Sequence, residues 1–169
     1  ASVVCNLSAS NFTVGKAEVR RTLARSISHR GKAVYMFVAA GPGESSTDLA
    51  FDADAFICEA GDVLSESKRF LRENQIITVD VDLSSLMRDR YSTNTFGDCS
   101  ARNRKPFRMI NFKAAPEKPE LMREVSPHPF LPSDPETLAT RCWETFEIQS
   151  NALATRIEAI GDTQLILGV

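Results

Sequence analysis

The sequence is poor in the residues that build metal centres and disulfide frameworks. Two histidines and four cysteines occur in 169 residues, and the cysteines are far apart, at Cys5, Cys58, Cys99 and Cys142. None of them forms a Cys-x-x-Cys pair, so neither a zinc site nor a disulfide framework is expected. Cys5 and Cys58 lie in apolar runs and are predicted to be small buried side chains.

The chain also lacks an excess of charge of either sign. It contains 20 Lys and Arg and 22 Asp and Glu, for a net charge of −2, and the two signs are interspersed. This pattern argues against a dedicated nucleic-acid or membrane surface. No apolar stretch approaches the roughly 20 residues of a transmembrane helix, and these residues contain no basic-then-apolar leader. We therefore expect a cytoplasmic protein without nucleic-acid or membrane partners.

Both ends of the chain are apolar. Residues 2–7 and 164–169 are typical of buried strands. In open α/β sheets, ligands bind just beyond the carboxyl ends of strands, and the loop that would follow residue 169 is not part of this sequence. We expect the chain to be an interior segment of a longer protein, so any function belongs first to the whole protein.

The first part of the chain is predicted to be α/β. Its apolar pattern indicates a strand buried on both faces, a helix and a second buried strand, over 2–7, about 16–30 and 33–38. In the helix, Val19, Leu23 and Ile27 share one face, which is typical of a packed surface, and the arginines lie elsewhere. Gly31 is expected to end this helix as a left-handed cap.

The next residues are predicted to form a hairpin and several short elements. An exposed loop is expected over 41–48, followed by a hairpin with strands over 49–59 and 63–70 around a turn at Gly61-Asp62. The elements expected after it are a strand over 75–83, a helix over 84–90 and a strand over 108–112. Ile77, Val79 and Val81 alternate with polar residues, which predicts one wetted face for that strand. Asp80 and Asp82 on this face are expected to aid solubility rather than catalysis.

A domain boundary is predicted at residues 113–133. Five prolines in this span remove amide donors and fix the backbone, which indicates a semi-rigid connector. A second helix follows, capped by Asp134 with Pro135 in its first turn or by a Ser133 capping box. It is expected to run to about residue 160, and a buried strand begins near Thr163.

No residue set satisfies the requirements of a free-standing catalytic site. The best candidate for ligand binding is the loop between the first strand and the first helix, because α/β proteins bind ligands there. Ser8 and Ser10 supply hydroxyl groups and Lys16 supplies a cation, a combination that suits a carboxylate or an amino-acid head group. From these residues alone, a capped turn with Lys16 in solvent is the favoured interpretation.

Several segments resemble one enzyme family. They are Cys5-Asn6-Leu7-Ser8-Ala9-Ser10, Gly15-Lys16, the run from Ala39 to Asp52, Pro129-Phe130-Leu131-Pro132, Glu147-Ile148-Gln149 and Leu167-Gly168-Val169. Together they are similar to glutamine-dependent NAD synthetases, whose glutaminase domain belongs to the nitrilase (carbon–nitrogen hydrolase) superfamily. The likeness covers nearly the whole chain, and the order of its two parts makes it more specific than any single motif.

The resemblance implies a fold and an activity. Residues 1–112 would be the C-terminal part of a nitrilase-like α/β/β/α sandwich, 113–133 a connector, and 134–169 the first helix and strand of an adenine-nucleotide α-hydrolase-like domain. In this family, glutamine is hydrolysed through a Cys-Glu-Lys triad. The ammonia then amidates nicotinic acid adenine dinucleotide to NAD, with ATP and Mg²⁺ used by the synthetase domain. Ser10 and Lys16 would bind glutamine, and a cytoplasmic homo-oligomer is expected.

Some family features are expected outside these residues. No catalytic or metal-binding residue is assigned here, because the triad and the Ser-Gly-Gly-x-Asp-Ser pyrophosphate loop should lie beyond both ends. The segment alone should then be inactive and bind no cofactor. Ala53 replaces the Gly of the family's Asp-Gly turn, which predicts a locally altered hairpin. Two alternatives stay open, a single-domain amidase of the nitrilase superfamily and a non-catalytic interaction module.

Overall fold

The computed structural model describes the chain except for residues 114–119, 129, 162–163, 165 and 167–169. The chain divides into two compact units, Ala1–Arg123 (unit 1) and Glu124–Val169 (unit 2), and each is described by itself. This division falls inside the proline-rich span 113–133. The assignment of the two parts to named domains stays a prediction.

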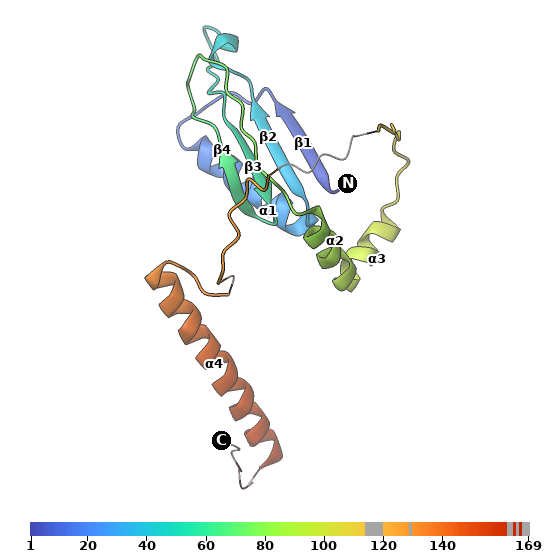
Figure 1. The fold of residues 1–169 in the computed structure, drawn as a ribbon, viewed down its shortest axis with the longest axis vertical. Coiled ribbons are helices and arrows are strands. Elements are labelled where there is room, and N and C mark those ends of the chain that lie inside the picture. Colours follow the sequence, from blue (N-terminus) through green and yellow to red (C-terminus); the bar gives the residue numbers. More distant parts are fainter. Residues whose placement is uncertain (114–119, 129, 162–163, 165, 167–169) are drawn as a thin grey trace. The chain divides into compact units, whose positions relative to one another are not determined.

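Unit 1 is built around a four-stranded mixed sheet with the strand order β1-β2-β3-β4 (Figure 1). The strands are β1 (Val3–Ser8), β2 (Val34–Ala39), β3 (Ala55–Glu59) and β4 (Asp62–Glu66). The first two strands are parallel and are connected through a helix, whereas β2–β3 and β3–β4 pair antiparallel. The predicted α/β class is therefore confirmed.

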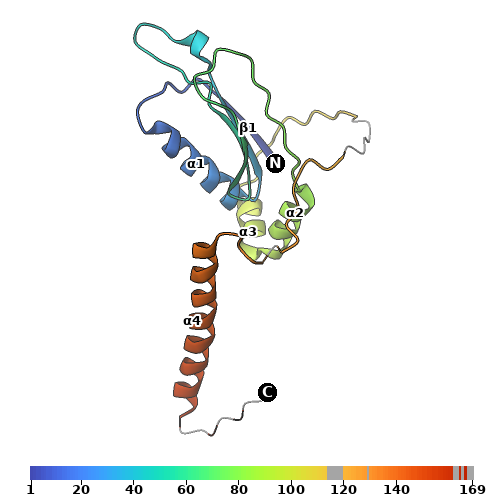
Figure 2. The same ribbon diagram turned by 60° about the vertical axis from the view of Figure 1, so that its left-hand side comes forward.

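Helix α1 (Lys16–Gly31) covers one face of this sheet (Figure 2). Its buried face consists of three small residues and one arginine, namely Ala17, Arg20, Ala24 and Ser28. The facing core contains the rings of Tyr35, Phe37 and Phe56. Small helix residues and large sheet residues interdigitate here, which gives close packing between the two layers.

The predicted packed face of α1 is wrong. Val19, Leu23 and Ile27 are 56%, 58% and 48% exposed, whereas Arg20 is only 7% exposed. The aromatic rings already fill the volume above the sheet, so the helix can approach only with its small side chains. Arg20 can be buried on this side because Asp52 neutralises its charge.

The C-terminus of α1 also differs from the prediction. Lys32, rather than Gly31, takes the left-handed conformation, with φ 45°. The carbonyl oxygens of Gly31 and Lys32 accept hydrogen bonds from the Arg90 guanidinium, at 3.1 and 3.0 Å. A cation at this position satisfies carbonyl groups that have no partner within the helix, and it interacts favourably with the helix dipole.

The opposite face of the sheet is covered in part by an extended segment, residues 76–82 (Figure 2). Ile77, Val79 and Val81 pack there against a core that includes Val34 and Ile57. The predicted alternation is confirmed, but the predicted strand is wrong, because the segment has no strand assignment. Side-chain packing holds the segment in place without ladder hydrogen bonds.

Strand β1 is an edge strand and is only half-buried. The prediction of burial on both faces is wrong, because residues alternate between exposed and partly buried along the strand. Val4 packs on the core under α1, whereas Cys5 is exposed and not buried as predicted. Cys58, on the inner strand β3, is buried as predicted, and this burial raises the pKa of its thiol.

The predicted hairpin is confirmed as β3 and β4, although both strands are shorter than expected. The turn lies one residue earlier than predicted, because Asp62 already belongs to β4. Ala60 and Gly61 form it with φ values of 51° and 100°, the conformation that two-residue type I′ hairpin turns require. Strand β3 begins at Ala55 instead of Leu49. Ala53 has φ 56°, and a residue in the left-handed region cannot continue a strand.

The conformation of Ala53 gives a stability prediction. Ala53→Gly should raise the free energy of unfolding by about 1 kcal/mol, because glycine adopts positive φ without the Cβ clash that alanine incurs. Urea unfolding followed by far-UV circular dichroism measures the change. Gly41→Ala is a suitable reference, since Gly41 has φ −83° and no atom within 4 Å of an added Cβ. A loss of stability in Ala53→Gly would contradict the left-handed assignment.

The helices after the extended segment agree only partly with the predictions. The helix expected at 84–90 is confirmed as α2 (Leu83–Ser92), with the Asp82 side chain accepting from Ser85 N–H at its start. Helix α3 (Asn94–Arg102) was not predicted, because its Thr, Asn and Gly residues have low helix propensity. The strand predicted at 108–112 is wrong. The loop at 41–48 is exposed as predicted and contains a short 3₁₀ turn, Pro42–Glu44.

Unit 2 contains the long helix α4 (Pro135–Ile160). Its predicted start is confirmed, because the Asp134 carboxylate accepts from the N–H of Thr137 at 2.7 Å and from its hydroxyl at 2.6 Å. These hydrogen bonds lower the pKa of Asp134. Gly161 follows the helix with φ 85°. The strand predicted from Thr163 falls largely outside the described residues.

Candidate functional site

Ser10 and Lys16, the predicted substrate-binding pair, lie in the loop that connects β1 to α1. Lys16 is the first residue of α1, after Gly15 with φ 83°. Its ammonium donates to the backbone oxygen of Asn11 at 2.7 Å and to the Asn11 side-chain oxygen at 3.3 Å. Lys16 is thus partly buried and held against the loop, and an ammonium can donate a third hydrogen bond.

A buried ion pair lies beneath this loop. The Arg20 guanidinium donates to both carboxylate oxygens of Asp52, at 2.9 and 3.0 Å. Its other terminal nitrogen donates to the backbone oxygens of Ser10 and Asn11, at 2.6 and 3.2 Å. The pair therefore connects the helix, the loop and the segment before β3 in the interior of unit 1.

Aromatic contacts hold the loop from a second side. The Phe12 ring meets the Phe70 ring edge-on at 5.0 Å between centroids, and the Arg69 guanidinium lies 5.4 Å from both. The Phe12 N–H donates to the Ala50 oxygen at 2.7 Å. The loop is thus fixed by side-chain and backbone contacts together.

A second ion-pair group lies farther along α1. Arg21 contacts Asp54 at 3.2 Å and Glu66 at 2.8 Å. Burial raises the pKa of Asp54, and the Arg21 guanidinium offsets this only in part. A carboxyl with a raised folded-state pKa binds its proton more tightly in the folded chain than in the unfolded chain. Its contribution to stability is therefore lost as the pH rises through that pKa.

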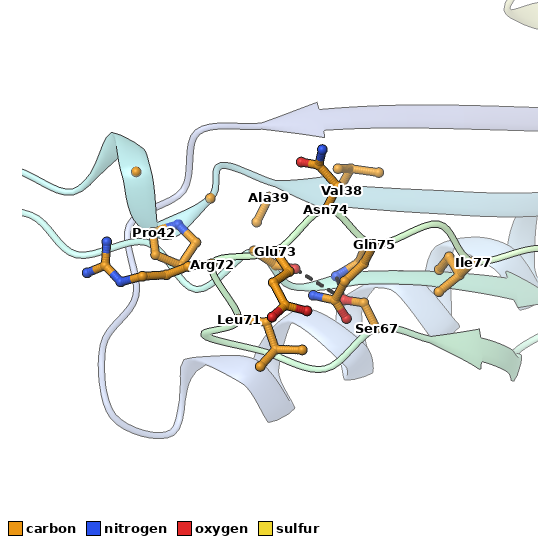
Figure 3. Close-up of a pocket in the computed structure, with 14 residues that line it drawn as sticks. Val38, Ala39, Pro42, Ser67, Leu71, Arg72, Glu73, Asn74, Gln75 and Ile77 are labelled. Carbon is orange, nitrogen blue, oxygen red and sulfur yellow. Dashed lines mark hydrogen bonds between the residues drawn. The ribbon is translucent and has the colours of Figure 1, made fainter.

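A cavity of about 350 Å³ lies near the carboxyl end of β2 (Figure 3). Pro42 and Arg72 are at one end of it, and Val38 and Ile77 are at the other. The Gln75 amide closes the adjoining loop by bonding both the N–H and the carbonyl of Lys68. Neither Ser10 nor Lys16 lines this cavity.

The sequence did not predict that Arg20 contacts the loop between β1 and α1 or that it pairs with Asp52. A signal was present, because Arg20 interrupts a face of small residues, Ala17, Ala24 and Ser28. Small residues at helical spacing indicate close packing, and an arginine among them needs a buried acceptor. The stronger stripe of Val19, Leu23 and Ile27 pointed to the other face.

Two further observations concern metals and membranes. Within the described residues, no group of three His, Cys, Asp or Glu side chains is placed to hold a metal ion. No helix in that part of the chain is long and apolar enough to cross a membrane.

Comparison with known proteins gives matches along the whole chain. The glutamine-dependent NAD(+) synthetase of Mycobacterium leprae (strain TN) is 42% identical over 174 aligned residues, and that of Mycobacterium tuberculosis (strain H37Rv) is 41% identical. Both alignments cover 100% of this chain and 26% of the relative. The chain thus spans about a quarter of the length of these relatives. No family model matches it.

Solved structures give smaller overlaps. A glutamine-dependent NAD(+) synthetase from Cytophaga hutchinsonii matches with a TM-score of 0.39 and 28% identity, over 41% of this chain and 12% of that one. The glutamine-dependent NAD+ synthetase from Acinetobacter baumannii, solved in complex with adenosine diphosphate, matches with a TM-score of 0.40 and 20% identity. This match covers 43% of this chain and 14% of that one. The sequence matches confirm the resemblance read from the motifs: along its entire length, this chain is similar to one part of glutamine-dependent NAD(+) synthetases.

Proposed function

We propose that the chain is part of a glutamine-hydrolysing NAD synthetase. The observation that carries this proposal is the 41–42% identity over the full chain. The whole enzyme would release ammonia from glutamine and use it, with ATP, to amidate nicotinic acid adenine dinucleotide. Residues 1–112 would complete a nitrilase-like sandwich, and residues 134–169 would begin the adenine-nucleotide α-hydrolase-like domain.

In this proposal, the chain contributes substrate binding and not the catalytic groups. The Lys16 ammonium would pair with the carboxylate of glutamine, and the Ser10 hydroxyl would donate to or accept from a polar group beside it. The position of the loop, between a strand and the helix that follows, supports this role. The triad would come from the parts of the enzyme that this chain does not span, so the segment alone would be inactive.

ATP and Mg²⁺ belong to the proposed synthetase domain. The described residues of unit 2 consist mainly of α4 and the residues before it, and no candidate metal cluster occurs in the part of the chain that the structure describes. In this proposal, ATP and Mg²⁺ bind residues of the synthetase domain that this chain does not span. A cytoplasmic homo-oligomer is part of the same proposal.

Substitutions at the two binding residues test the proposed function. In the complete synthetase, Lys16→Ala should lower kcat/KM for glutamine about 10- to 100-fold, because it removes a hydrogen bond to a charged group worth about 1.5–3 kcal/mol. Ser10→Ala should lower it about 2- to 10-fold, because a hydrogen bond between neutral groups is worth about 0.5–1.5 kcal/mol. NAD formation from ammonium salts should be unchanged. The assay compares both nitrogen sources at saturating ATP.

A matched control uses an exposed lysine outside the loop. Lys105→Ala removes an ammonium from an exposed position and should leave both activities unchanged. Equal losses with glutamine and with ammonia in Lys16→Ala would argue against a glutamine-binding role.

A further inference from the structure

Arg20 has an unusual position for a helix arginine. Its side chain is 6% exposed and that of Asp52 is fully buried. The two terminal nitrogens divide their contacts, one bonding the Asp52 carboxylate and the other the carbonyl oxygens of Ser10 and Asn11. Only a planar guanidinium can make this set of contacts at once, because a lysine presents a single donor atom.

The carbonyl of Asn11 connects this ion pair to Lys16. Its oxygen accepts from the Arg20 guanidinium at 3.2 Å and from the Lys16 ammonium at 2.7 Å. Two cations therefore meet at one oxygen atom. Arg20 and Arg69 share the Asp52 carboxylate, at 2.9 and 3.8 Å. The Lys16 ammonium bonds only Asn11 within the described residues, so its charge is available to an anion.

We propose that Arg20, braced by Asp52, is a positioning residue that fixes Ser10 and Lys16 in the geometry needed to bind a carboxylate-bearing substrate. This inference rests on the proposed function and extends it to residues that do not contact the substrate. The chain of contacts runs from Asp52 to Arg20, to the oxygens of Ser10 and Asn11, and from Asn11 to Lys16. Small displacements of groups that bind and orient a substrate reduce kcat/KM strongly.

The test replaces Arg20 in the complete synthetase. Arg20→Gln should raise KM for glutamine about 10- to 100-fold, with ammonia-driven NAD formation changed by less than about twofold. Arg20→Lys should give an intermediate KM. It keeps a positive charge beside Asp52 but loses the second terminal nitrogen, which bonds the oxygens of Ser10 and Asn11. Amide hydrogen exchange of residues 9–13 should be faster in Arg20→Gln. This measurement follows the opening of the loop backbone directly.

Arg21→Gln is the matched control. It removes the neighbouring arginine, which pairs with Asp54 and Glu66 instead of the loop. Its thermal stability should fall, while KM for glutamine and exchange at residues 9–13 stay unchanged. An equal rise of KM in both variants would mean general loosening of the fold and would overturn the proposal.

The possible outcomes separate this inference from the proposed function. If Lys16→Ala impairs glutamine use and Arg20→Gln does not, the positioning role is wrong and the function stands. If neither Lys16→Ala nor Ser10→Ala affects glutamine use, the assignment of the loop to glutamine fails and this inference fails with it. If Arg20→Gln does not fold, Asp52→Asn is tested by the same criteria, because it weakens the ion pair with Arg20 and leaves Arg20 in place.

Discussion

Phe56→Ala should lower the free energy of unfolding by about 3–5 kcal/mol, the cost of removing a large buried ring without refilling its volume. Phe56 is fully buried on the inner strand β3. Its ring stacks on Phe37 at 5.1 Å with an interplanar angle of 18°, and the Arg21 guanidinium lies 5.4 Å from its centre. The substitution therefore removes burial, ring stacking and a cation–π contact together.

Urea unfolding followed by far-UV circular dichroism measures this loss. Phe107→Ala is the control, because Phe107 belongs to the same unit and is 80% exposed. Its substitution should change stability by less than about 0.5 kcal/mol. If the two alanine variants were equally stable, the core described for the α1 face of the sheet would be wrong.

Asp52→Ala should cost about 3–5 kcal/mol for a different reason. It leaves the buried Arg20 guanidinium without the carboxylate whose two oxygens accept from one of its nitrogens, and it removes the ion-pair partner of Arg69 at 3.8 Å. An uncompensated buried charge is strongly destabilising. Asp54, 3.8 Å from Arg20, compensates in part, which places the expected loss near the lower end of the range. Because the pair is buried, high salt should not remove the effect.

Thermal unfolding at low and high salt tests this prediction. Asp48→Ala removes a carboxylate from the exposed loop after β2 and should change stability by less than about 0.5 kcal/mol. Asp52→Asn keeps an acceptor oxygen for Arg20, so its loss of stability should lie between those of Asp48→Ala and Asp52→Ala. A small, salt-sensitive loss in Asp52→Ala would indicate a solvated pair instead of a buried one.

Elements with strong local signals were predictable from sequence. The hairpin could be located because Gly61-Asp62 separates two apolar runs, and the start of α4 because Asp134-Pro135 is a strong capping sequence. In both cases a local backbone preference and the tertiary structure agree. The loop between β1 and α1 was located in the same way, from its place between a strand and a helix.

Predictions that depended on burial were less successful. Cys5 was predicted to be buried but is exposed, because β1 is at the edge of the sheet. The local sequence pattern does not determine the order of strands in a sheet. The span 75–83 has the alternation of a strand, yet only pairing partners decide whether a ladder forms. Alternation reports which side chains face the core and gives no information on hydrogen-bonding neighbours.

The sequence by itself determined the α/β class, the location of the hairpin, the start of α4 and the likeness to glutamine-dependent NAD(+) synthetases. Backbone preferences and apolar periodicity act over a few residues, so they can be read locally. Motif order is compared position by position along the sequence. Only the tertiary structure decided which face of α1 is buried and that Arg20 reaches Asp52, 32 positions away in the sequence. The burial of a charged side chain depends on a partner that folding supplies, because charge is stable in the interior only where it is neutralised.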